Sequence, residues 1–472
     1  MSVAEAQARG HKGHTFVAFV VIAVSVSVVA VASARQTAAP PPATLYEGAL
    51  LISGGGDAPI ANSAFLVQDG TITSVGRRGD IALPRGAARV DLSGKVVMPT
   101  LINAHGHPGF QKGLTYTRAN YTRSTYLDDL HRAAYYGVRV VMAQGIDPGD
   151  LVYEIRRDQQ GGVAGGARLL TAGRGIGAPN AGPGAAAYQG IAYEVTTPDE
   201  GRAAVLELAA RKVDLVKIWV DDRGGRAPRL PATVYRAIID ESHRQGLKIN
   251  AHVFYHEDAE GLVDAGIDGL AHLVRDREMS DGLIAAIVRR GVYVMPNLGG
   301  AERGTYARLP PWFEEPGLMA LLRDSVPAAG VDRVRASFTT RDAAAASTAR
   351  GRYAVLQRSL AKLAKAGARV ILGSDTGLDD HFFGYAEQRE LEAMVGAGLT
   401  PAQAVVAATS RSAEYLGLRE MGRLAVGTRA DFIVLFGNPL GDIRQTRSIE
   451  AVYFDGRPLD RAALRARLSG MK

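Results

Sequence analysis

Cysteine is absent from this chain of 472 residues. Its absence excludes disulfide bonds, thiolate zinc ligands, a cysteine nucleophile and a lipid-modified N-terminal cysteine. Any metal ion must therefore be bound by histidine, carboxylate or chemically modified side chains. The missing cysteines do not decide the cellular compartment, because exported proteins also exist without disulfides.

A strong charge and a basic cluster are also missing. The formal net charge is only +7, and the surplus is spread along the chain without a basic run that contains interleaved aromatics. We therefore expect a mildly cationic surface and no nucleic-acid partner. A content of 47% hydrophobic and 22% charged residues is typical of a soluble globular protein.

The N-terminus carries an apolar run over Phe16–Val31, with Arg9 and Lys12 before it and Ala32-Ser33-Ala34 after it. This order predicts a signal peptide over residues 1–34, followed by a leader rich in proline and alanine over residues 35–44. We expect an exported protein, periplasmic or secreted, without stable membrane association after cleavage. The alternative is an uncleaved anchor, because the run approaches the ~17 residues that can span a bilayer.

Two strand-rich segments lie near the ends of the mature chain, over residues 45–98 and 418–460. Both alternate apolar and polar residues, and Asp69-Gly70 is a hairpin signal between two such runs. We expect a small β-sandwich-like domain that is built from both termini.

The middle of the chain, over residues 99–417, alternates short β-branched runs with helical stretches. Thr197-Pro198-Asp199-Glu200 has the capping-box pattern that starts a helix. This alternation predicts an α/β fold, a (β/α)8 TIM-type barrel, in which functional groups gather at the C-terminal ends of the strands. The predicted strands are Lys95–Met98, Arg139–Ala143, Arg168–Ala172, Leu215–Val220, Lys248–Ala251, Gly269–Leu273, Val292–Met295 and Arg369–Leu372.

One segment, residues 299–350, interrupts this alternation between the seventh and eighth predicted strands. It begins with turn-forming residues and continues into an alanine-rich helical part. A long excursion on the catalytic face predicts a lid or a wall of the substrate pocket.

His105 and His107 follow the first predicted strand. Alternate residues of an extended segment point the same way, so both imidazoles can reach one ion, although this pair alone is weak evidence. Lys217 lies inside the fourth predicted strand, where an unpaired ammonium is costly to bury. It either reaches the barrel mouth, pairs with Asp221 or Asp222, or has another function.

His252, His272 and Asp375 lie at the ends of the fifth, sixth and eighth predicted strands. Each is unremarkable singly, but strand ends of a parallel barrel meet at one face. Together with His105, His107 and Lys217 they are too many ligands for one tetrahedral zinc ion. Six converging groups indicate two metal ions that share a bridging hydroxide.

The chain resembles members of the amidohydrolase superfamily, in the branch of imidazolonepropionase-like and prolidase-like proteins. The resemblance extends from about Leu45 to Leu459. It rests on the strand-four lysine and on the motifs VVMPTLINAHGH, INAHVFYHEDAEGLVDAGIDGLAH, LGSDTG, GRLAVGTRADFIVL and NPLGDI.

The resemblance implies a role for each of the six residues. His105, His107 and Asp375 would hold one divalent metal ion, and His252 and His272 the second. Lys217 would be carboxylated by CO2 to a carbamate that bridges both ions. Zinc is the expected metal, with manganese, cobalt or iron as alternatives. Asp375 would also act as general base and then general acid in the hydrolysis of an amide-type C–N bond.

Two positions depart from the family pattern. Thr100 stands where the family often has glycine, and Asn103 where it often has aspartate. Neither position is a ligand, so we expect an altered backbone fit rather than lost chemistry.

Further candidates surround the six residues. Tyr255 could polarise the substrate carbonyl, and Arg275 could bind a substrate carboxylate in bidentate fashion or pair with Asp276. His256 and His381 are candidate substrate contacts. The expected partner is a small amide, namely a dipeptide, an N-acyl amino acid or a cyclic amide, and a homo-oligomer is compatible with the sequence.

Two alternative functions differ from this prediction. One is a mononuclear, deaminase-like hydrolase of a ring C–N bond, with Lys217 unmodified. The other is a catalytically silent barrel that only binds a ligand, which the complete ligand set argues against.

Overall fold

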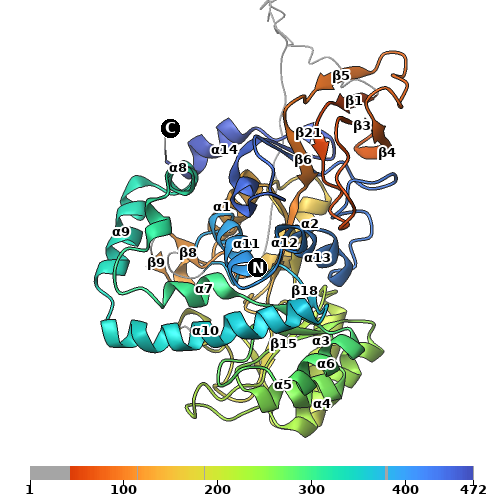
Figure 1. Cartoon of the computed structure of the whole chain (residues 1–472). Coiled ribbons are helices and arrows are strands. Elements are labelled where there is room, and N and C mark those ends of the chain that lie inside the picture. The colour runs from red at the N-terminus through yellow and green to blue at the C-terminus, as the bar shows by residue number, and fades with distance from the viewer. Residues whose placement is uncertain (1–42, 114, 185, 378–380, 471–472) are drawn as a thin grey trace, which may run out of the picture. The chain divides into compact units, whose positions relative to one another are not determined.

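The computed structural model of the protein describes residues 43–113, 115–184, 186–377 and 381–470, which form one compact unit (Figure 1). The predicted signal peptide and nearly all of the predicted leader lie outside these residues. Within the described ranges, no helix is both long enough and apolar enough to cross a membrane.

Two small sheets contain the strands from the two ends of the chain. The four-stranded sheet has the order β4 (Thr71–Arg77), β3 (Ser63–Gln68), β1 (Thr44–Glu47), β5 (Ala88–Asp91). The five-stranded sheet has the order β2 (Leu50–Leu51), β6 (Val96–Pro99), β19 (Phe432–Leu435), β20 (Ile449–Phe454), β21 (Arg457–Pro458). Because β6 pairs with β19, the second sheet joins N-terminal and C-terminal segments.

The predicted hairpin at Asp69-Gly70 is confirmed. The two residues connect β3 to β4 with φ values of 47° and 76°. Glycine adopts such left-handed values without strain and aspartate tolerates them, which explains the sequence of this turn.

Two parallel sheets form the α/β part of the fold, as predicted. One has the order β11 (Arg168–Thr171), β10 (Val138–Ala143), β7 (Leu101–Gly106). The other has the order β13 (Tyr193–Glu194), β12 (Ile176–Gly177), β14 (Val216–Trp219), β15 (Ile249–His252), β16 (Gly269–Ala271), β17 (Tyr293–Met295), β18 (Arg369–Val370). Short strands β8 (Gln111–Lys112) and β9 (Thr115–Tyr116) form a separate antiparallel pair.

The first predicted strand, Lys95–Met98, is wrong as a member of the parallel sheets. Val96–Pro99 pairs with β19 in the five-stranded sheet, and β7 is the strand that pairs with β10. Only Thr100 separates β6 from β7, so one apolar run passes through both sheets. Periodicity cannot locate such a change of sheet, because both strands are fully buried.

Backbone hydrogen bonds also join the two parallel sheets to each other. The Asp214 amide donates to the Thr171 carbonyl (2.8 Å) on one side. On the other side, Ala104 donates to Leu372 and Asp375 donates to His105, both at 2.9 Å. The last of these bonds brings the segment after β18 beside the histidine pair.

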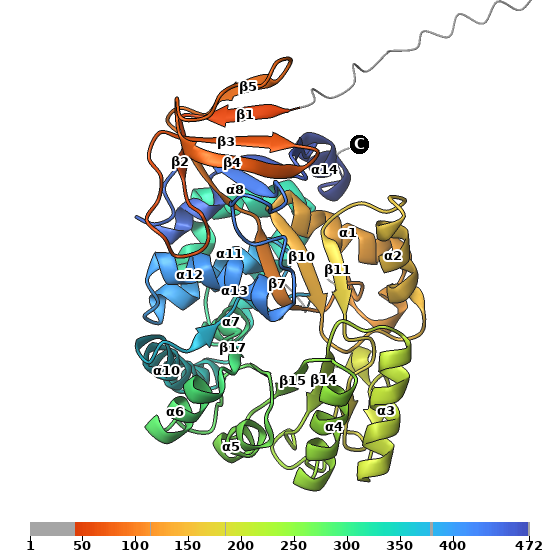
Figure 2. The same ribbon diagram turned by 90° about the vertical axis from the view of Figure 1, so that its right-hand side faces the viewer.

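Helices surround the parallel strands (Figure 2). Pro198–Ala210 begins at the predicted capping box, with Thr197 accepting a hydrogen bond from the Glu200 amide. The α-helices outside the segment between β17 and β18 are α1 (Arg123–Tyr135), α2 (Leu151–Gln160), α3 (Pro198–Ala210), α4 (Ala232–Arg244), α5 (His256–Ala265), α6 (Asp281–Arg290), α11 (Tyr385–Gly396), α12 (Pro401–Ala408), α13 (Ser410–Tyr415) and α14 (Arg461–Leu468). Single 3-10 turns occupy η1 (Arg118–Asn120), η2 (Ala186–Tyr188) and η4 (Ile443–Arg447).

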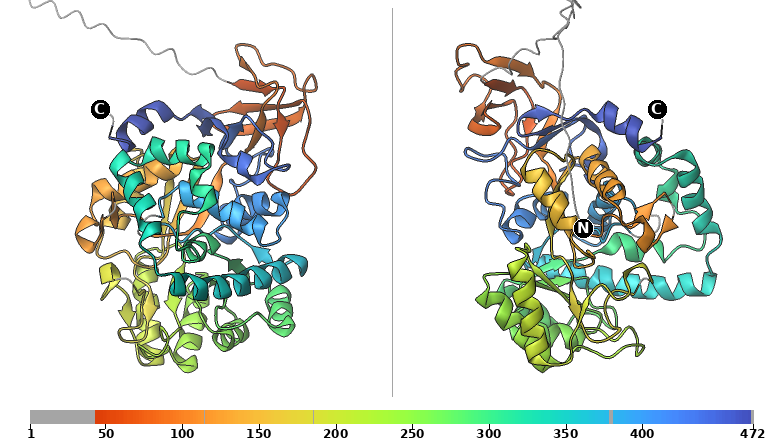
Figure 3. Two further views of the ribbon diagram at one scale, coloured as in Figure 1. Left: turned by 60° about the vertical axis from the view of Figure 1, so that its left-hand side comes forward. Right: turned by 180° about the vertical axis from the view of Figure 1, so that it is seen from behind.

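The segment between β17 and β18 is helical throughout much of its length. It contains α7 (Leu298–Arg303), η3 (Pro311–Glu314), α8 (Pro316–Ser325), α9 (Ala328–Thr339) and α10 (Ala343–Lys365). The predicted boundary at residue 350 therefore falls inside α10. Helix α8 packs beside α14 (Figure 3). Tyr136, directly after α1, donates a hydrogen bond to the Leu321 carbonyl.

Candidate active site

The end of β7 and the segment after β18 bring three predicted ligands together. The Nε2 atoms of His105 and His107 are 3.3 Å apart. The Oδ1 atom of Asp375 lies 3.3 Å from His105 Nε2 and 3.0 Å from His107 Nε2. Two ligand atoms of a tetrahedral ion with bonds of about 2.0 Å are separated by about 3.3 Å. The spacing of these three atoms therefore fits one face of the coordination shell of a single ion.

His252 and His272 adjoin this group on the neighbouring strands. The His272 ring centre is 4.5 Å from that of His252 and 5.2 Å from that of His105. Burial lowers the pKa values of His105, His252 and His272 well below the usual range of an imidazole, and nearby cationic groups lower them further. They are consequently neutral at physiological pH, which is the form that binds metal ions.

Lys217 lies inside β14 and is only 1% exposed. Its Nζ makes no hydrogen bond to any described residue. The alternative partners are engaged elsewhere: Asp221 lies 3.5 Å from His252 Nε2, and Asp222 accepts hydrogen bonds from Tyr255 and Arg229. Burial lowers the pKa of Lys217 to about 7, against the opposing charge of Asp375, so a large neutral fraction exists at pH 7.

Left-handed backbone conformations occur at three neighbouring positions of the site. His272, Asn297 and Asp375 have φ values of 72°, 52° and 54°. The Asn297 side chain holds two of the strand ends, since it accepts from the His272 amide (3.0 Å) and donates to the Gly373 carbonyl (2.8 Å). Such strained positions are characteristic of functional sites, where the surrounding structure enforces them.

The Asn103 side chain likewise connects the backbone of His105 to the segment after β18. Its Oδ1 accepts hydrogen bonds from the amides of His105 (3.0 Å) and Ser374 (3.2 Å), and its Nδ2 donates to the Glu387 carboxylate (2.5 Å). Burial raises the pKa of Glu387 to about 7. An aspartate at position 103 would place two carboxylates in contact, so the amide suits this chain's buried glutamate.

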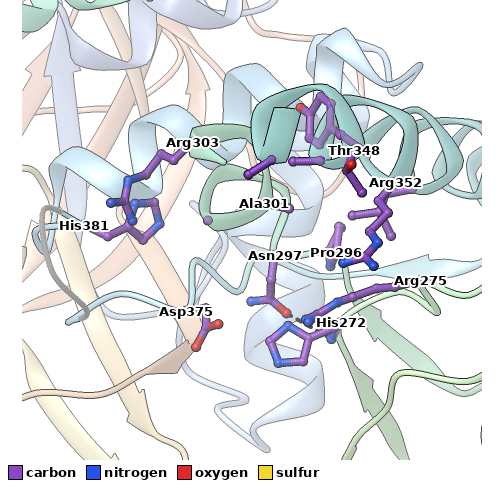
Figure 4. Close-up of a pocket in the computed structure, with 15 residues that line it drawn as sticks. His272, Arg275, Pro296, Asn297, Ala301, Arg303, Thr348, Arg352, Asp375 and His381 are labelled. Carbon is purple, nitrogen blue, oxygen red and sulfur yellow. Dashed lines mark hydrogen bonds between the residues drawn. The ribbon is translucent and has the colours of Figure 1, made fainter. Parts of the chain in front are cut away.

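A pocket of about 570 Å³ opens over this group of residues (Figure 4). Asp375 and His272 lie on one side of it, and α7 and α10 line the other. Its lining residues are His272, Arg275, Pro296, Asn297, Gly300, Ala301, Arg303, Ala345, Thr348, Ala349, Arg352, Tyr353, Leu356, Asp375 and His381.

The four predicted substrate contacts divide into two pairs. Arg275 and His381 line the pocket, and His381 Nε2 lies 2.9 Å from the Ser374 carbonyl. Tyr255 and His256 do not line it. Tyr255 donates to Asp222 (2.8 Å), and His256 Nε2 lies 3.1 Å from both the amide and the hydroxyl of Ser280.

The amidohydrolase family model matches residues 96–459. This range exceeds half of the chain and contains all six predicted ligands. The chain therefore belongs to the amidohydrolase family, and the resemblance noted in the sequence is confirmed.

Solved structures with the same fold include prolidase-like proteins and other amidohydrolases. A protein from Bifidobacterium longum described as a prolidase candidate is 25% identical, with a TM-score of 0.69 over 91% of this chain and 100% of that chain. A Xaa-Pro dipeptidase with bound methionine is 20% identical, with a TM-score of 0.69 over 88% and 99% of the two chains. Phenylurea hydrolase B is 22% identical, with a TM-score of 0.70 over 89% and 97%.

Curated relatives cover less of the chain. Uncharacterized proteins of Mycobacterium tuberculosis and Mycobacterium bovis are 34% identical over 139 residues, which are 29% of this chain and 35% of those proteins. The match thus spans about a third of the length of these relatives.

Sequence reasoning missed several residues of the site. Asn297 follows the seventh strand, and a systematic inspection of strand ends would have found it. Glu390 accepts hydrogen bonds from the Leu298 and Gly299 amides, and Arg303 and Arg352 line the pocket. These three lie on helices, where nothing in the local sequence separates them from surface charges.

Proposed function

We propose that the protein is a metal-dependent hydrolase that cleaves the C–N bond of a small amide, with two divalent metal ions and a carboxylated Lys217. The buried Nζ of Lys217 carries this proposal. A lysine amine without a partner, placed among four histidines and an aspartate, repels cations when it is protonated. Carboxylation would convert it into an anionic ligand that suits the other five groups.

The donor atoms support two sites. His105, His107 and Asp375 are spaced as ligands of one ion, and His252 and His272 would hold a second. The metal ions, when bound, supply Lewis-acid activation of water and of the scissile carbonyl. Zinc is the expected metal for these ligands, and manganese, cobalt or iron would fit the same set.

The chemistry of Lys217 requires its neutral form. The Nζ lone pair attacks the carbon of CO2, and the nitrogen loses one proton to give a carbamate anion. A pKa of about 7 makes the neutral amine abundant at physiological pH, whereas an ordinary lysine is almost entirely protonated there.

Asp375 is the proposed acid–base catalyst. Its carboxylate lies within 3.3 Å of both His105 and His107, and its side chain lines the pocket. It would accept a proton from the attacking water and transfer it to the leaving amine. Arg275 lines the same pocket and would bind a carboxylate of the substrate.

We also propose that the two parallel sheets close into one eight-stranded barrel. The hydrogen bonds from Asp214 to Thr171 and from Ala104 to Leu372 support this closure. The first joins the segment before β14 to β11, and the second joins β7 to the segment after β18. A closed barrel would bring the ends of its strands to one face, as the proposed metal centre requires.

Metal analysis of the purified protein tests the proposal. We expect two equivalents of metal in the wild type, and loss of one together with at least a ~10³-fold decrease in kcat/KM in Lys217→Ala. Lys248→Ala, which changes another partly buried lysine outside the site, should retain both. One equivalent in the wild type would favour the mononuclear, deaminase-like alternative, and none after reconstitution would favour a binding protein.

NMR spectroscopy tests the carboxylation of Lys217 directly. Protein reconstituted with metal and ¹³C-bicarbonate should show one carbamate carbon signal by NMR, which Lys217→Ala should lack. Unaltered metal content and turnover in Lys217→Ala would refute the role of this lysine.

Dipeptides, N-acyl amino acids and cyclic amides are the proposed substrates. A prolidase candidate and a Xaa-Pro dipeptidase among the structural relatives support the first class. Phenylurea hydrolase B shares the fold as well, so a screen should also include ureas.

Export is a separate proposal that rests on residues 1–34. The basic residues, the apolar run and the Ala-Ser-Ala site support cleavage of a signal peptide. N-terminal sequencing of the protein recovered outside the cytoplasm should then begin near residue 35, and an intact N-terminus would favour the membrane anchor.

A further inference from the structure

The charges of the pocket are unbalanced. Among its described lining residues, Asp375 is the one acidic side chain, whereas Arg275, Arg303 and Arg352 are cationic. Asp375 already lies beside His105 and His107 and is a proposed metal ligand. The described lining residues of the pocket thus carry more positive than negative charge.

Arg275 and Arg352 lie at the same end of the pocket but come from distant segments. Arg275 follows β16, whereas Arg352 belongs to α10. Figure 4 shows the Arg352 side chain next to that of Arg275, while Arg303 lies near His381 at the other end. Burial lowers the pKa of Arg275, the charges of Asp375 and Asp221 raise it, and the charge of Arg352 lowers it. The two guanidinium groups are therefore within electrostatic reach of each other.

Neither guanidinium forms a hydrogen bond or an ion pair with a described residue. Arg275 lies near the ring of Phe254, whose centre is 5.8 Å from its guanidinium carbon, and it interacts at longer range with the charges of Asp375 and Asp221. The buried Arg389, in contrast, donates to Glu302 at 2.8 Å. Because Arg275 and Arg352 have no hydrogen-bonded carboxylate among the described residues, a bound anion would relieve their mutual repulsion.

Helix α10 presents one continuous face to the pocket. Ala345, Thr348 and Ala349 are small and leave room for a ligand, and Arg352 follows one turn later on the same face. A ligand that lies along this face would therefore contact Arg352 and Arg275 with one part and Asp375 with another.

We infer that Arg275 and Arg352 together bind a carboxylate on the amine portion of the substrate, so that the enzyme selects N-acyl amino acids or dipeptides with a free carboxylate over neutral amides. Arg352 is then a specificity-determining residue contributed by α10, which lies between β17 and β18. The inference rests on the proposed amide hydrolysis and narrows its substrate class.

Paired substrates test this selection. A panel of dipeptides and N-acyl amino acids, each with its C-terminal carboxamide, is assayed with the metal-loaded protein. We expect kcat/KM to favour the acid by about 10-fold to 100-fold, because hydrogen bonds between charged groups are lost in the amide. Arg352→Gln should reduce this ratio about 10-fold and Arg275→Gln at least as much.

Arg289→Gln is the matched control, because it removes the same charge from an exposed position of α6 that does not line the pocket. The acid-to-amide ratio should not change in this variant. An equal preference for acid and amide in the wild type, or an unaltered ratio in Arg352→Gln, would overturn the inference.

A binding measurement separates this inference from the proposed function. If no member of the panel is hydrolysed, the proposed hydrolysis fails, and calorimetric titration with N-acetyl-L-leucine and its carboxamide still decides the inference. Tighter binding of the acid that weakens in both arginine variants supports it. Equal binding, or none, refutes it.

Discussion

The candidate active site consists of two regions that are built differently. The six proposed ligands lie on strands or at their ends, where hydrogen bonds such as that from His272 to Asn297 fix the backbone. The facing wall is formed by α7 and α10, and its Arg352 is exposed and lacks a hydrogen-bond partner in the described part of the chain. Under the proposed function, metal binding and substrate choice therefore depend on separate elements, the strand ends and the helical wall.

Asp375→Asn tests the strand-end region and should have the largest effect. We expect kcat/KM to fall by about 10²- to 10⁴-fold for every substrate, because the acid–base group is lost. Asparagine tolerates the left-handed φ of 54°, so the fold should persist. Kinetics and circular dichroism measure both effects, with the exposed Asp240→Asn as control. Retention of more than a tenth of the activity would contradict the assigned role.

Asn297→Gly should have a smaller effect on the same region. Glycine accepts the φ of 52° but removes the hydrogen bonds to His272 and Gly373. We expect metal affinity and kcat to fall about 10- to 100-fold, equally for all substrates. Competition with a metal chelator measures the affinity. Asn180→Gly, at another left-handed asparagine, should leave it unchanged, and an effect limited to some substrates would argue against the separation of the two regions.

Ala349→Leu tests the helical wall. The larger side chain would occupy part of the pocket, so KM for bulky substrates should rise about 10-fold while metal content stays the same. Steady-state kinetics with a small and a bulky substrate measure the difference. Ala344→Leu, on the exposed first turn of α10, is the control. A loss of metal in Ala349→Leu would show that the wall also shapes the metal centre.

Glu390→Gln tests the contact between α11 and the start of α7 in the helical wall, and it should affect stability more than catalysis. Burial raises the pKa of Glu390 to about 8, so between about pH 4.5 and 8 the folded protein retains a proton that the unfolded chain has lost. Stability consequently falls by up to ~1.4 kcal/mol per pH unit over this window. Urea unfolding of the metal-free protein at pH 5 and pH 8 should show a smaller fall in Glu390→Gln than in the wild type or in the exposed Glu154→Gln. Equal falls would refute this assignment.

The strand-end region could be anticipated from the sequence because its signals are local. His105, His252 and His272 each occur at the end of a short apolar run, and parallel strands gather such ends at one face. The prediction that Lys95–Met98 belongs to the parallel sheets was wrong because one apolar segment continues through two sheets. Hydrophobic patterning describes burial but does not identify the sheet that provides it.

The helical wall could not be anticipated in the same way. Arg352 is separated from Arg275 by 77 positions, and its proximity depends on how α10 crosses the pocket. An arginine on an alanine-rich helix has the same local sequence pattern whether its side chain faces solvent or substrate. Tyr255 was placed near the carbonyl from its position after His252, yet its hydroxyl bonds to Asp222.

Helix α10 has 23 residues, and its two halves have different contacts. The first half lines the pocket, whereas Arg358 and Lys362 in the second half pair with Glu278 near α6. The ion pairs of the second half would keep the helix in place while the first half, which lines the pocket, accumulates substitutions. New substrate preferences could therefore evolve, or be engineered, through a handful of positions one helical turn apart, without any change in the catalytic machinery.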